Sequence, residues 1–575
     1  KDRLLSFWED FKSGSGDIPI EVRGTNMGTG MDLATDLVPL QELYRRRLMK
    51  YPPPNSPWGA LDDDFGLEMT GYMSRIAELP GEGFPFRFYI NDPWYWQNPW
   101  FHLYNREPFD IYCPMSVTRI NRDGKAENPS IVEFLTIDTE KGELDERCPR
   151  QVIPHILQAA EEFPDEPGIL TWLYPFGDYH TVAAGHPDKI GQLFFGDWFT
   201  RNAVNQGLPL NTVISAEIFQ ALMAGNSRAL ESTILFTPAP LLEDTYEPEL
   251  LRFIRQGGRV LFYGPVLTSK TAAMLNVKHG GGLEGCCTLT ASLPMDRLHQ
   301  PKHDPEFRHV SELSGGKLTE LLDNASDPYT RVHAYAVQGA EKRLFALTRS
   351  LPEWNGGAVG WVRGSLPFES GLASHEPVSL PIRQAERYMD TSVFVRYVLA
   401  ELGYAFLQEK ADAATRSVLN FVSRHNNAFF FSGCKPDTTV IQQFAFPDGA
   451  PLVIGKEARV SGGFASYCFD RSFRGECRGF VKQQEAGVIS CRETVPRPTD
   501  RHYPERCIRV AHLQDADVTI YPPPEALRAN KVEVSSRATS HSSLIDEESY
   551  LNLEGAVHGN RIILKQISGT IEITW

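Results

Sequence analysis

Two carboxylates lie where a predicted buried strand ends and a loop begins. Residues 131–138 form an apolar run that predicts a buried strand, with Asp138 at its end and Glu140 two positions later. On an extended chain, residues two apart point to the same side. Such carboxyl groups can act as general acid, general base or nucleophile. The alternative interpretation is that both merely cap the following loop.

A second group of polar and aromatic residues follows another predicted strand, residues 86–90. The segment 91–100 combines Trp, Tyr, Asn, Asp and Gln, and its candidate ligand-binding residues are Asn91, Asp92, Trp94 and Trp96. Sugar rings lay apolar C–H faces on aromatic planes, while amides and carboxylates bind the hydroxyls. The segment therefore predicts a sugar subsite, although each aromatic residue taken alone could equally belong to a core.

A third group lies at the end of residues 169–176, which also predict a buried strand. Trp172 belongs to this strand, and Tyr179 and His180 follow it closely. If the strands are parallel neighbours, all three residues lie at the same edge as the aromatic segment. They are therefore candidate substrate-binding residues.

A Gly-rich segment near the start of the chain, residues 24–32, supplies two more candidates. Asn26 could bind a sugar hydroxyl and Asp32 could act as an acid. No Lys-Ser or Lys-Thr follows the glycines, so this is not a phosphate-binding loop. The segment could equally be a simple backbone turn.

The elements that carry these residues predict a (β/α)8-type barrel over residues 1–185. A helix expected at 150–163 lies between two of the strands and completes a unit of a parallel sheet. Sites of such barrels lie at the carboxyl ends of the strands. Because a complete barrel takes roughly 250 residues, we expect this one to be incomplete at its N-terminal side. Residues 121–124, Asn-Arg-Asp-Gly, predict a hairpin turn instead of a crossover helix.

The remaining chain predicts two further domains. Residues 186–412 read as a doubly wound α/β domain with an insertion at about 267–385, and residues 413–575 as a β-sandwich. Strands are expected at 212–214, 232–236 and 260–263, and helices at 194–205, 247–256 and 390–402. The fold class is thus α/β plus all-β.

Three segments of the second domain, residues 208–214, 232–238 and 248–260, resemble the amidotransferase-like trimerisation domain of family 42 β-galactosidases. The resemblance implies the order barrel, amidotransferase-like domain and β-sandwich, and a homo-oligomer, either a dimer or a trimer. An active amidotransferase needs a nucleophilic Cys, and this domain has none between Cys148 and Cys286.

The resemblance further implies a glycoside hydrolase that uses two carboxylates, with retention of configuration. Glu140 or Asp138 would be the nucleophile or base, and Glu140 fits the family chemistry better. Asp32 is the candidate acid, although the Asn-Glu dipeptide expected after strand 4 of the barrel occurs nowhere in the chain. An inverting phosphorylase of similar architecture and a catalytically inactive glycan-binding protein remain as alternatives.

Composition narrows the possible partners. The 57 Lys and Arg against 73 Asp and Glu give a net charge of −16, which argues against nucleic-acid binding. No apolar run is long enough to cross a membrane, and His and Cys lack metal-site spacing, so neither a metal nor another cofactor is expected. Free thiols in a reducing, cytoplasmic compartment are favoured. Because the sequence starts at Lys1 within a barrel, an upstream part of the same gene product is expected to complete it.

Overall fold

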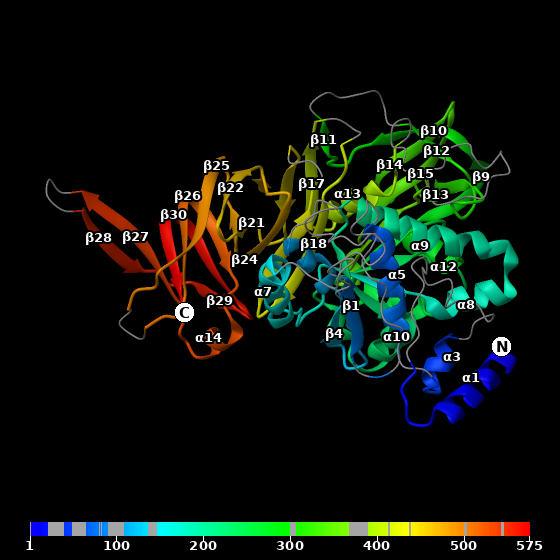
Figure 1. Ribbon diagram of the computed structural model, residues 1–575. Coiled ribbons are helices and arrows are strands. Elements are labelled where there is room, and N and C mark those ends of the chain that lie inside the picture. Colours follow the sequence, from blue (N-terminus) through cyan, green and yellow to red (C-terminus); the bar gives the residue numbers. More distant parts are fainter. Residues whose placement is uncertain are drawn as a thin grey trace.

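A computed structural model describes residues 2–20, 40–48, 65–79, 81, 83–89, 108–135, 146–298, 306–366, 389–411, 415–435, 439–498, 503–541 and 546–575. These residues form an α/β part and an all-β C-terminal part, which lie side by side in an elongated molecule (Figure 1). The predicted combination of α/β and all-β structure is confirmed. No helix of the described residues has the length and apolar character needed to span a bilayer.

The α/β part is built on an eleven-stranded sheet with a parallel centre. In spatial order the parallel strands are β16 (Ala358–Val362), β8 (Arg259–Tyr263), β7 (Ile234–Pro238), β5 (Leu170–Tyr174), β6 (Leu210–Ser215) and β2 (Thr118–Ile120). From β5 the chain steps to β6 on one side, returns to β7 on the other side, and continues to β8. This reversal of direction is the mark of a doubly wound sheet.

Helices cover both faces of this sheet. One face packs against α5 (Phe65–Glu78), α9 (Ile190–Asn205) and α13 (Val393–Glu401), and the other against α10 (Ala216–Gly225), α11 (Glu247–Arg255) and α12 (Ser269–Leu275). Strand β5 alternates between the two cores, with Trp172 and Tyr174 in the first and Leu173 in the second. Its five residues are all buried, as expected for a central parallel strand.

The position of β5 corrects one expectation. Residues 169–176 were expected to supply a strand to the barrel, but Leu170–Tyr174 lies between β6 and β7 in the doubly wound sheet. A short, continuously apolar strand suits a barrel and a doubly wound sheet equally, so its sequence alone does not distinguish them. The strands that pair with it, β6 and β7, show that it belongs to the doubly wound sheet.

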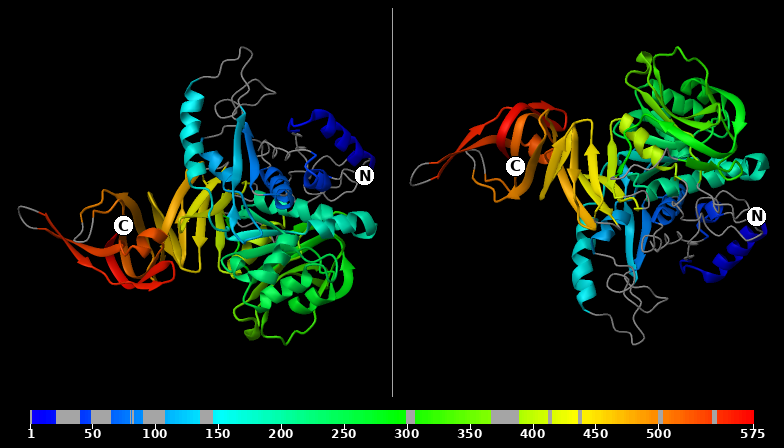
Figure 2. Two further views of the ribbon diagram at one scale, coloured as in Figure 1. Left: turned by 90° about the horizontal axis from the view of Figure 1, so that it is seen from below. Right: turned by 90° about the horizontal axis from the view of Figure 1, so that it is seen from above.

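Two parallel strands stand apart from the large sheets. β1 (Phe84–Tyr89) pairs with β4 (Pro129–Leu135), and the register places Tyr89 opposite Leu135. Figure 2 shows this pair on the opposite side of the molecular centre from β9, β10 and β12–β15.

The expected hairpin at residues 121–124 is confirmed, because β2 pairs in antiparallel fashion with β3 (Ala126–Glu127). The barrel as a whole remains a prediction.

The segment expected as an insertion, about residues 267–385, adds strands to the large sheet. β15 (Glu341–Arg349) pairs with β16, and β14 (Thr330–Gln338), β10 (Gly285–Ala291) and β12 (Glu306–His309) follow outward, all antiparallel. β9 (Val277–Leu283) and β13 (Leu318–Leu322) form a separate two-stranded antiparallel sheet.

The C-terminal part is a fifteen-stranded, almost wholly antiparallel β-structure. Its strands are β11 (Arg297–Leu298), β17 (Ala405–Lys410), β18 (Leu419–His425), β19 (Ala428–Cys434), β20 (Ile441–Ala445), β21 (Ala450–Val453), β22 (Lys456–Ser461), β23 (Phe464–Tyr467), β24 (Ser472–Lys482), β25 (Gly487–Thr494), β26 (Cys507–Ile520), β27 (Glu533–His541), β28 (Asp546–Asn552), β29 (Ala556–His558) and β30 (Arg561–Thr574). Phe429, Phe431, Phe444, Phe446 and Phe480 stack edge to face or at a tilt in its core.

The remaining helices lie at the edges of the α/β part. They are α1 (Asp2–Ser15), α3 (Leu40–Arg45), α6 (Tyr112–Met115), α7 (Arg147–Glu161) and α8 (Phe176–Gly185), while α14 (Pro524–Arg528) belongs to the C-terminal part. A helix was expected at 150–163, and α7 confirms it.

A buried ion pair joins the α/β part to the C-terminal strands. Arg396 of α13 is 1% exposed and binds Asp296 through both terminal nitrogens, at 2.8 and 2.6 Å. Its guanidinium also donates to the carbonyl oxygens of Gln206 and Phe406. These four hydrogen bonds, two of them to a carboxylate, connect α13 to residues after α9, before β11 and in β17.

Helix α5 packs so closely on α9 that it requires a glycine. A Cβ on Gly66 would lie 2.1 Å from the carbonyl oxygen of Arg201, and the Gly66 amide donates to Asn205 at 2.7 Å. We predict that Gly66→Ala lowers the free energy of unfolding by about 2 kcal/mol, measured by urea denaturation. Gly14→Ala in exposed α1, where a Cβ meets nothing within 4 Å, is the control. An equal loss in both variants would contradict the packing argument.

Candidate functional site

The parallel ladder of β1 and β4 brings the ends of two predicted strands to one edge. Tyr89 and Leu135 are paired at its carboxyl end. In the sequence, the aromatic segment follows Tyr89 directly and the carboxylate segment follows Leu135 directly. The candidates themselves, Asn91, Asp92, Trp94, Trp96, Asp138 and Glu140, lie outside the described residues, as do Asn26 and Asp32.

The remaining three candidates are described, and two of them are buried. Trp172 and Tyr179 are both 0% exposed, and the indole nitrogen of Trp172 donates to the Tyr263 hydroxyl at 3.2 Å. Burial raises the pKa of Tyr179 well above its ordinary value. Neither ring is exposed to a substrate. Trp172 lies in β5, a central strand covered by helices on both sides, and Tyr179 lies in α8 with its ring packed against Tyr174. His180, in α8, is only partly buried and its ring lies beside Phe176.

Two buried carboxylates lie near these residues, and the sequence analysis did not single them out. Asp178 is 6% exposed and accepts a hydrogen bond from Thr245 at 2.9 Å. Burial, opposed by this hydrogen bond and reinforced by the charge of Glu247, raises its pKa to about 6. Glu247 is 0% exposed, and one of its oxygens accepts hydrogen bonds from Thr268 and Thr271. Doubly wound sheets bind ligands near this edge of β5 and β7, but here the chain's own side chains occupy it.

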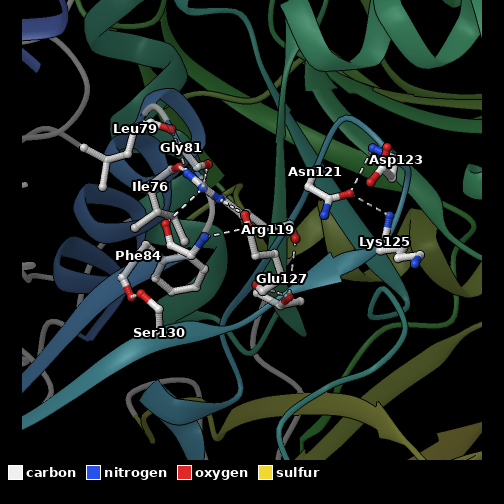
Figure 3. Close-up of polar contacts among 12 residues, drawn as sticks. Ile76, Leu79, Gly81, Phe84, Arg119, Asn121, Asp123, Lys125, Glu127 and Ser130 are labelled. Carbon is white, nitrogen blue, oxygen red and sulfur yellow. Dashed lines mark hydrogen bonds and ion pairs between the residues drawn. The ribbon is translucent and has the colours of Figure 1, made fainter. Parts of the chain in front are cut away.

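A cleft of about 780 Å³ opens at the carboxyl ends of β6 and β2. Its walls come from the end of α5, the β2–β3 hairpin and the start of α10 (Figure 3). The described lining residues are Arg45, Ala77, Glu78, Leu79, Gly81, Arg119, Asn121, Arg122, Asp123, Glu127, Ser215, Glu217 and Ile218. Its size is within the usual range of small-molecule sites, which is roughly 300 to 1,000 Å³.

The back of the cleft is held by Arg119, which is 3% exposed. Its Nε donates to Glu127 at 2.5 Å. Its two terminal nitrogens donate to four carbonyl oxygens at 2.8 to 3.0 Å, that of Ile76 in the last turn of α5 and those of Leu79, Gly81 and Gly83 in the stretch that links α5 to β1. All five N–H donors of the guanidinium are therefore used, as Figure 3 shows.

A carboxyl group with a displaced pKa lines the same cleft. Burial, reinforced by the charge of Glu217 and opposed by Arg119, raises the pKa of Glu78 to about 8. Glu78 is therefore protonated at neutral pH and can donate a hydrogen bond. Glu217, by contrast, has a side chain that is 67% exposed and forms an ion pair with Arg122 across the cleft mouth. Carboxyl groups in such different environments can take different chemical roles.

Neither Glu78 nor Arg119 belongs to a motif that the sequence could have revealed. Glu78 ends an amphipathic helix and Arg119 lies within a short strand, where charged residues are ordinarily at the surface. An Arg inside an otherwise apolar strand was the only available signal. Among the described residues, no three His, Cys, Asp or Glu side chains are grouped so as to hold a metal ion.

Comparison with known proteins finds no matching family model and no matching curated sequence. Among solved structures, the cold-adapted β-galactosidase from Rahnella sp. R3 has a TM-score of 0.40 at 10% identity, over 77% of this chain and 62% of that one. The β-galactosidase from the psychrophilic Marinomonas ef1 has a TM-score of 0.34 at 8% identity, over 72% and 66%. The exo-β-1,4-mannosidase Op5Man5 from Opitutaceae bacterium strain TAV5 has a TM-score of 0.26 at 10% identity, over 40% and 36%.

The first of these relationships spans about three fifths of the length of the solved enzyme. A GH42 β-galactosidase, Gan42B, is also among the similar structures, with a TM-score of 0.34. The family that the sequence resembles is thus represented among these structures. At such low scores and identities, the likeness carries no argument about activity.

The Arg119 contacts generate the first prediction for this site. Arg119→Lys keeps the positive charge, but the Lys side chain has one nitrogen where the guanidinium has three. Several buried carbonyl oxygens therefore lose their hydrogen-bond donors. We expect the free energy of unfolding to fall by about 3 kcal/mol, measured by urea denaturation. Arg122→Lys, on the same hairpin but 65% exposed, is the control and should change it by less than about 0.5 kcal/mol. Similar losses in the two variants would contradict the role assigned to Arg119.

The raised pKa of Glu78 generates a second prediction. In the unfolded chain Glu78 ionises near its ordinary value of 4.5, and in the folded chain near 8. Stability should therefore fall as the pH rises through this window, because only the unfolded chain can release the proton. We expect Glu78→Gln to remove part of this fall, roughly 3 kcal/mol between pH 5 and 8.

The measurement is urea denaturation at several pH values, with Glu457→Gln as the control, since Glu457 has a 57% exposed side chain on β22. Parallel pH profiles for wild type and Glu78→Gln would show that the carboxyl is ionised in the folded protein.

Proposed function

We propose that this protein is a glycoside hydrolase that acts at the carboxyl edge of β1 and β4. The observation that carries the proposal is the pairing of Tyr89 with Leu135 in a parallel ladder. An aromatic and amide-rich segment suited to a sugar ring and a segment with two carboxylates follow these paired residues directly in the sequence. Cleavage of a glycosidic bond requires this combination of a sugar subsite and carboxyl groups.

The proposed mechanism uses two carboxyl groups and retains the anomeric configuration. Glu140 or Asp138 acts as nucleophile or base, and Asp32 is the candidate acid. In retaining enzymes the two carboxyl groups lie about 5 Å apart, and in inverting enzymes roughly 6.5 to 9.5 Å apart, with room for a water molecule. Trp94 and Trp96 would stack on the sugar ring, while Asn91 and Asp92 would bind its hydroxyls. His180 is the described residue that could also contact substrate.

The substrate class we propose is an oligosaccharide or polysaccharide, and the protein is proposed to act as a homo-oligomer. β-Galactosides and β-mannosides are the first substrates to test, since the similar structures include β-galactosidases and an exo-β-1,4-mannosidase. The doubly wound domain would support the assembly, as the resemblance to the trimerisation domain implies.

The decisive experiment replaces the two carboxylates. With p-nitrophenyl β-D-galactoside and β-D-mannoside as probes, we predict that Glu140→Gln or Asp138→Asn lowers kcat at least 1,000-fold, roughly the contribution of a catalytic carboxylate. The control is Glu457→Gln on β22. Full turnover in both carboxylate variants, on a substrate that the wild type cleaves, would overturn the assignment.

Two further outcomes separate the alternatives. Turnover that requires inorganic phosphate and releases a sugar phosphate would indicate an inverting phosphorylase, in which one carboxylic acid suffices. Sugar binding without product release, with or without phosphate, would indicate a catalytically inactive glycan-binding protein. Either result would overturn the hydrolase proposal.

A further inference from the structure

The cleft beside Arg119 and Glu217 is separate from the edge where catalysis is proposed. Leu79 and Gly81, which line the cleft, precede the first residue of β1, whereas Tyr89 and Leu135 end the ladder at its other end. A ligand in the cleft would therefore contact the amino end of β1, the β2–β3 hairpin and the start of α10. It would not compete directly for the carboxyl edge of β1 and β4.

Several described features suit this cleft to a ligand. It lies outside the carboxyl ends of two parallel neighbours, β6 and β2, where open α/β sheets place their binding sites. Ser215 ends β6 there and accepts a hydrogen bond from the Ile218 amide, which fixes the start of α10. Arg119 fixes the opposite wall through its five hydrogen bonds. The walls are thus held in place by the protein's own contacts.

The charges of the lining indicate a neutral ligand. The charged lining side chains are three arginines, Arg45, Arg119 and Arg122, and three carboxylates, Asp123, Glu127 and Glu217, while Glu78 is protonated at neutral pH. Arg119 pairs with Glu127, and Arg122 pairs with Glu217. A phosphate or a polyamine would therefore find no excess of opposite charge. This balance favours an uncharged polar molecule.

The hydrogen-bonding groups of the cleft match a molecule with many hydroxyl groups. Among the described residues, Asn121 engages only its side-chain oxygen, which accepts from the amides of Asp123 and Lys125 at 3.0 Å (Figure 3). Its amide nitrogen can donate to a ligand. The Glu217 carboxylate can accept, and Leu79 and Ile218 supply apolar surface. Hydroxyls that both donate and accept can use all of these groups.

We propose that this cleft binds a neutral mono- or disaccharide at a second site, distinct from the catalytic edge. The choice of a saccharide among neutral polar ligands rests on the proposed function. Such a site would hold a sugar, or one end of a longer glycan, on the side of the molecule where α10 begins. Its occupation would not require any group of the proposed catalytic machinery.

The test measures where sugars bind, using the full chain with D-galactose, D-mannose and lactose as probes. Hydrogen exchange, read by mass spectrometry, should slow in peptides that cover residues 118–127 and 214–220 when a probe is added. Glu217→Ala removes an exposed acceptor and leaves the fold intact. In this variant the sugar concentration needed to give the same protection should rise at least tenfold. Glu217→Gln, which keeps an acceptor oxygen, should restore part of it.

The matched control is Arg492→Ala, which breaks an equally exposed ion pair with Glu457 on the C-terminal strands. It should leave sugar binding unchanged. Absence of protection in residues 118–127 and 214–220 with all three probes, or protection unaffected by Glu217→Ala, would overturn the second site. Repeating the measurement in Glu140→Gln keeps the two proposals distinguishable. Cleft protection without hydrolysis would refute only the proposed function, and hydrolysis without cleft protection would refute only the second site.

Discussion

The arrangement of the α/β part depends on the guanidinium of Arg119. This side chain belongs to β2 of the large sheet, yet four of its five hydrogen bonds go to backbone carbonyls, one in the last turn of α5 and three in the stretch that links α5 to β1. An unpaired buried charge would be costly, so the linking stretch must take the one path that satisfies every donor. This path sets where β1 begins, and through the parallel ladder it also sets where β1 and β4 end.

The same constraint connects the two proposed sites. At the amino end of β1 the bonds of Arg119 form one wall of a neutral, polar cleft, and at the carboxyl end the ladder pairs Tyr89 with Leu135. The ladder spans six residues of β1, so a change at one end is transmitted only through a short, stiff element. On the same face of the sheet, the buried pair of Arg396 and Asp296 holds the C-terminal strands against α13. Two buried arginines thus connect separate parts of the fold through their hydrogen bonds.

Much of the fold could be predicted from the sequence, because the signals were local. The hairpin at residues 121–124, the helix α11 with its following glycines, and the alternating C-terminal strands all follow from turn chemistry and periodicity. The placement of β5 could not be predicted in this way. Its apolar run indicates burial on both faces but does not indicate which strands lie beside it. Because the strand was assigned to a barrel, Trp172 and Tyr179 were expected in a binding site, whereas they lie in the core.

The sequence by itself determined the chemical inventory: two carboxylates after one strand, an aromatic segment after another, and a net charge that argues against polyanionic partners. Only the tertiary structure decided that these two strands are neighbours, that Trp172 and Tyr179 are buried, and that Glu78 has a pKa of about 8. The physical reason is the range of the interactions. Strand and turn propensities act within a few residues. The pairing of β1 with β4 and the hydrogen bonds of Arg119 to backbone carbonyls instead join residues that lie 36 to 46 positions apart.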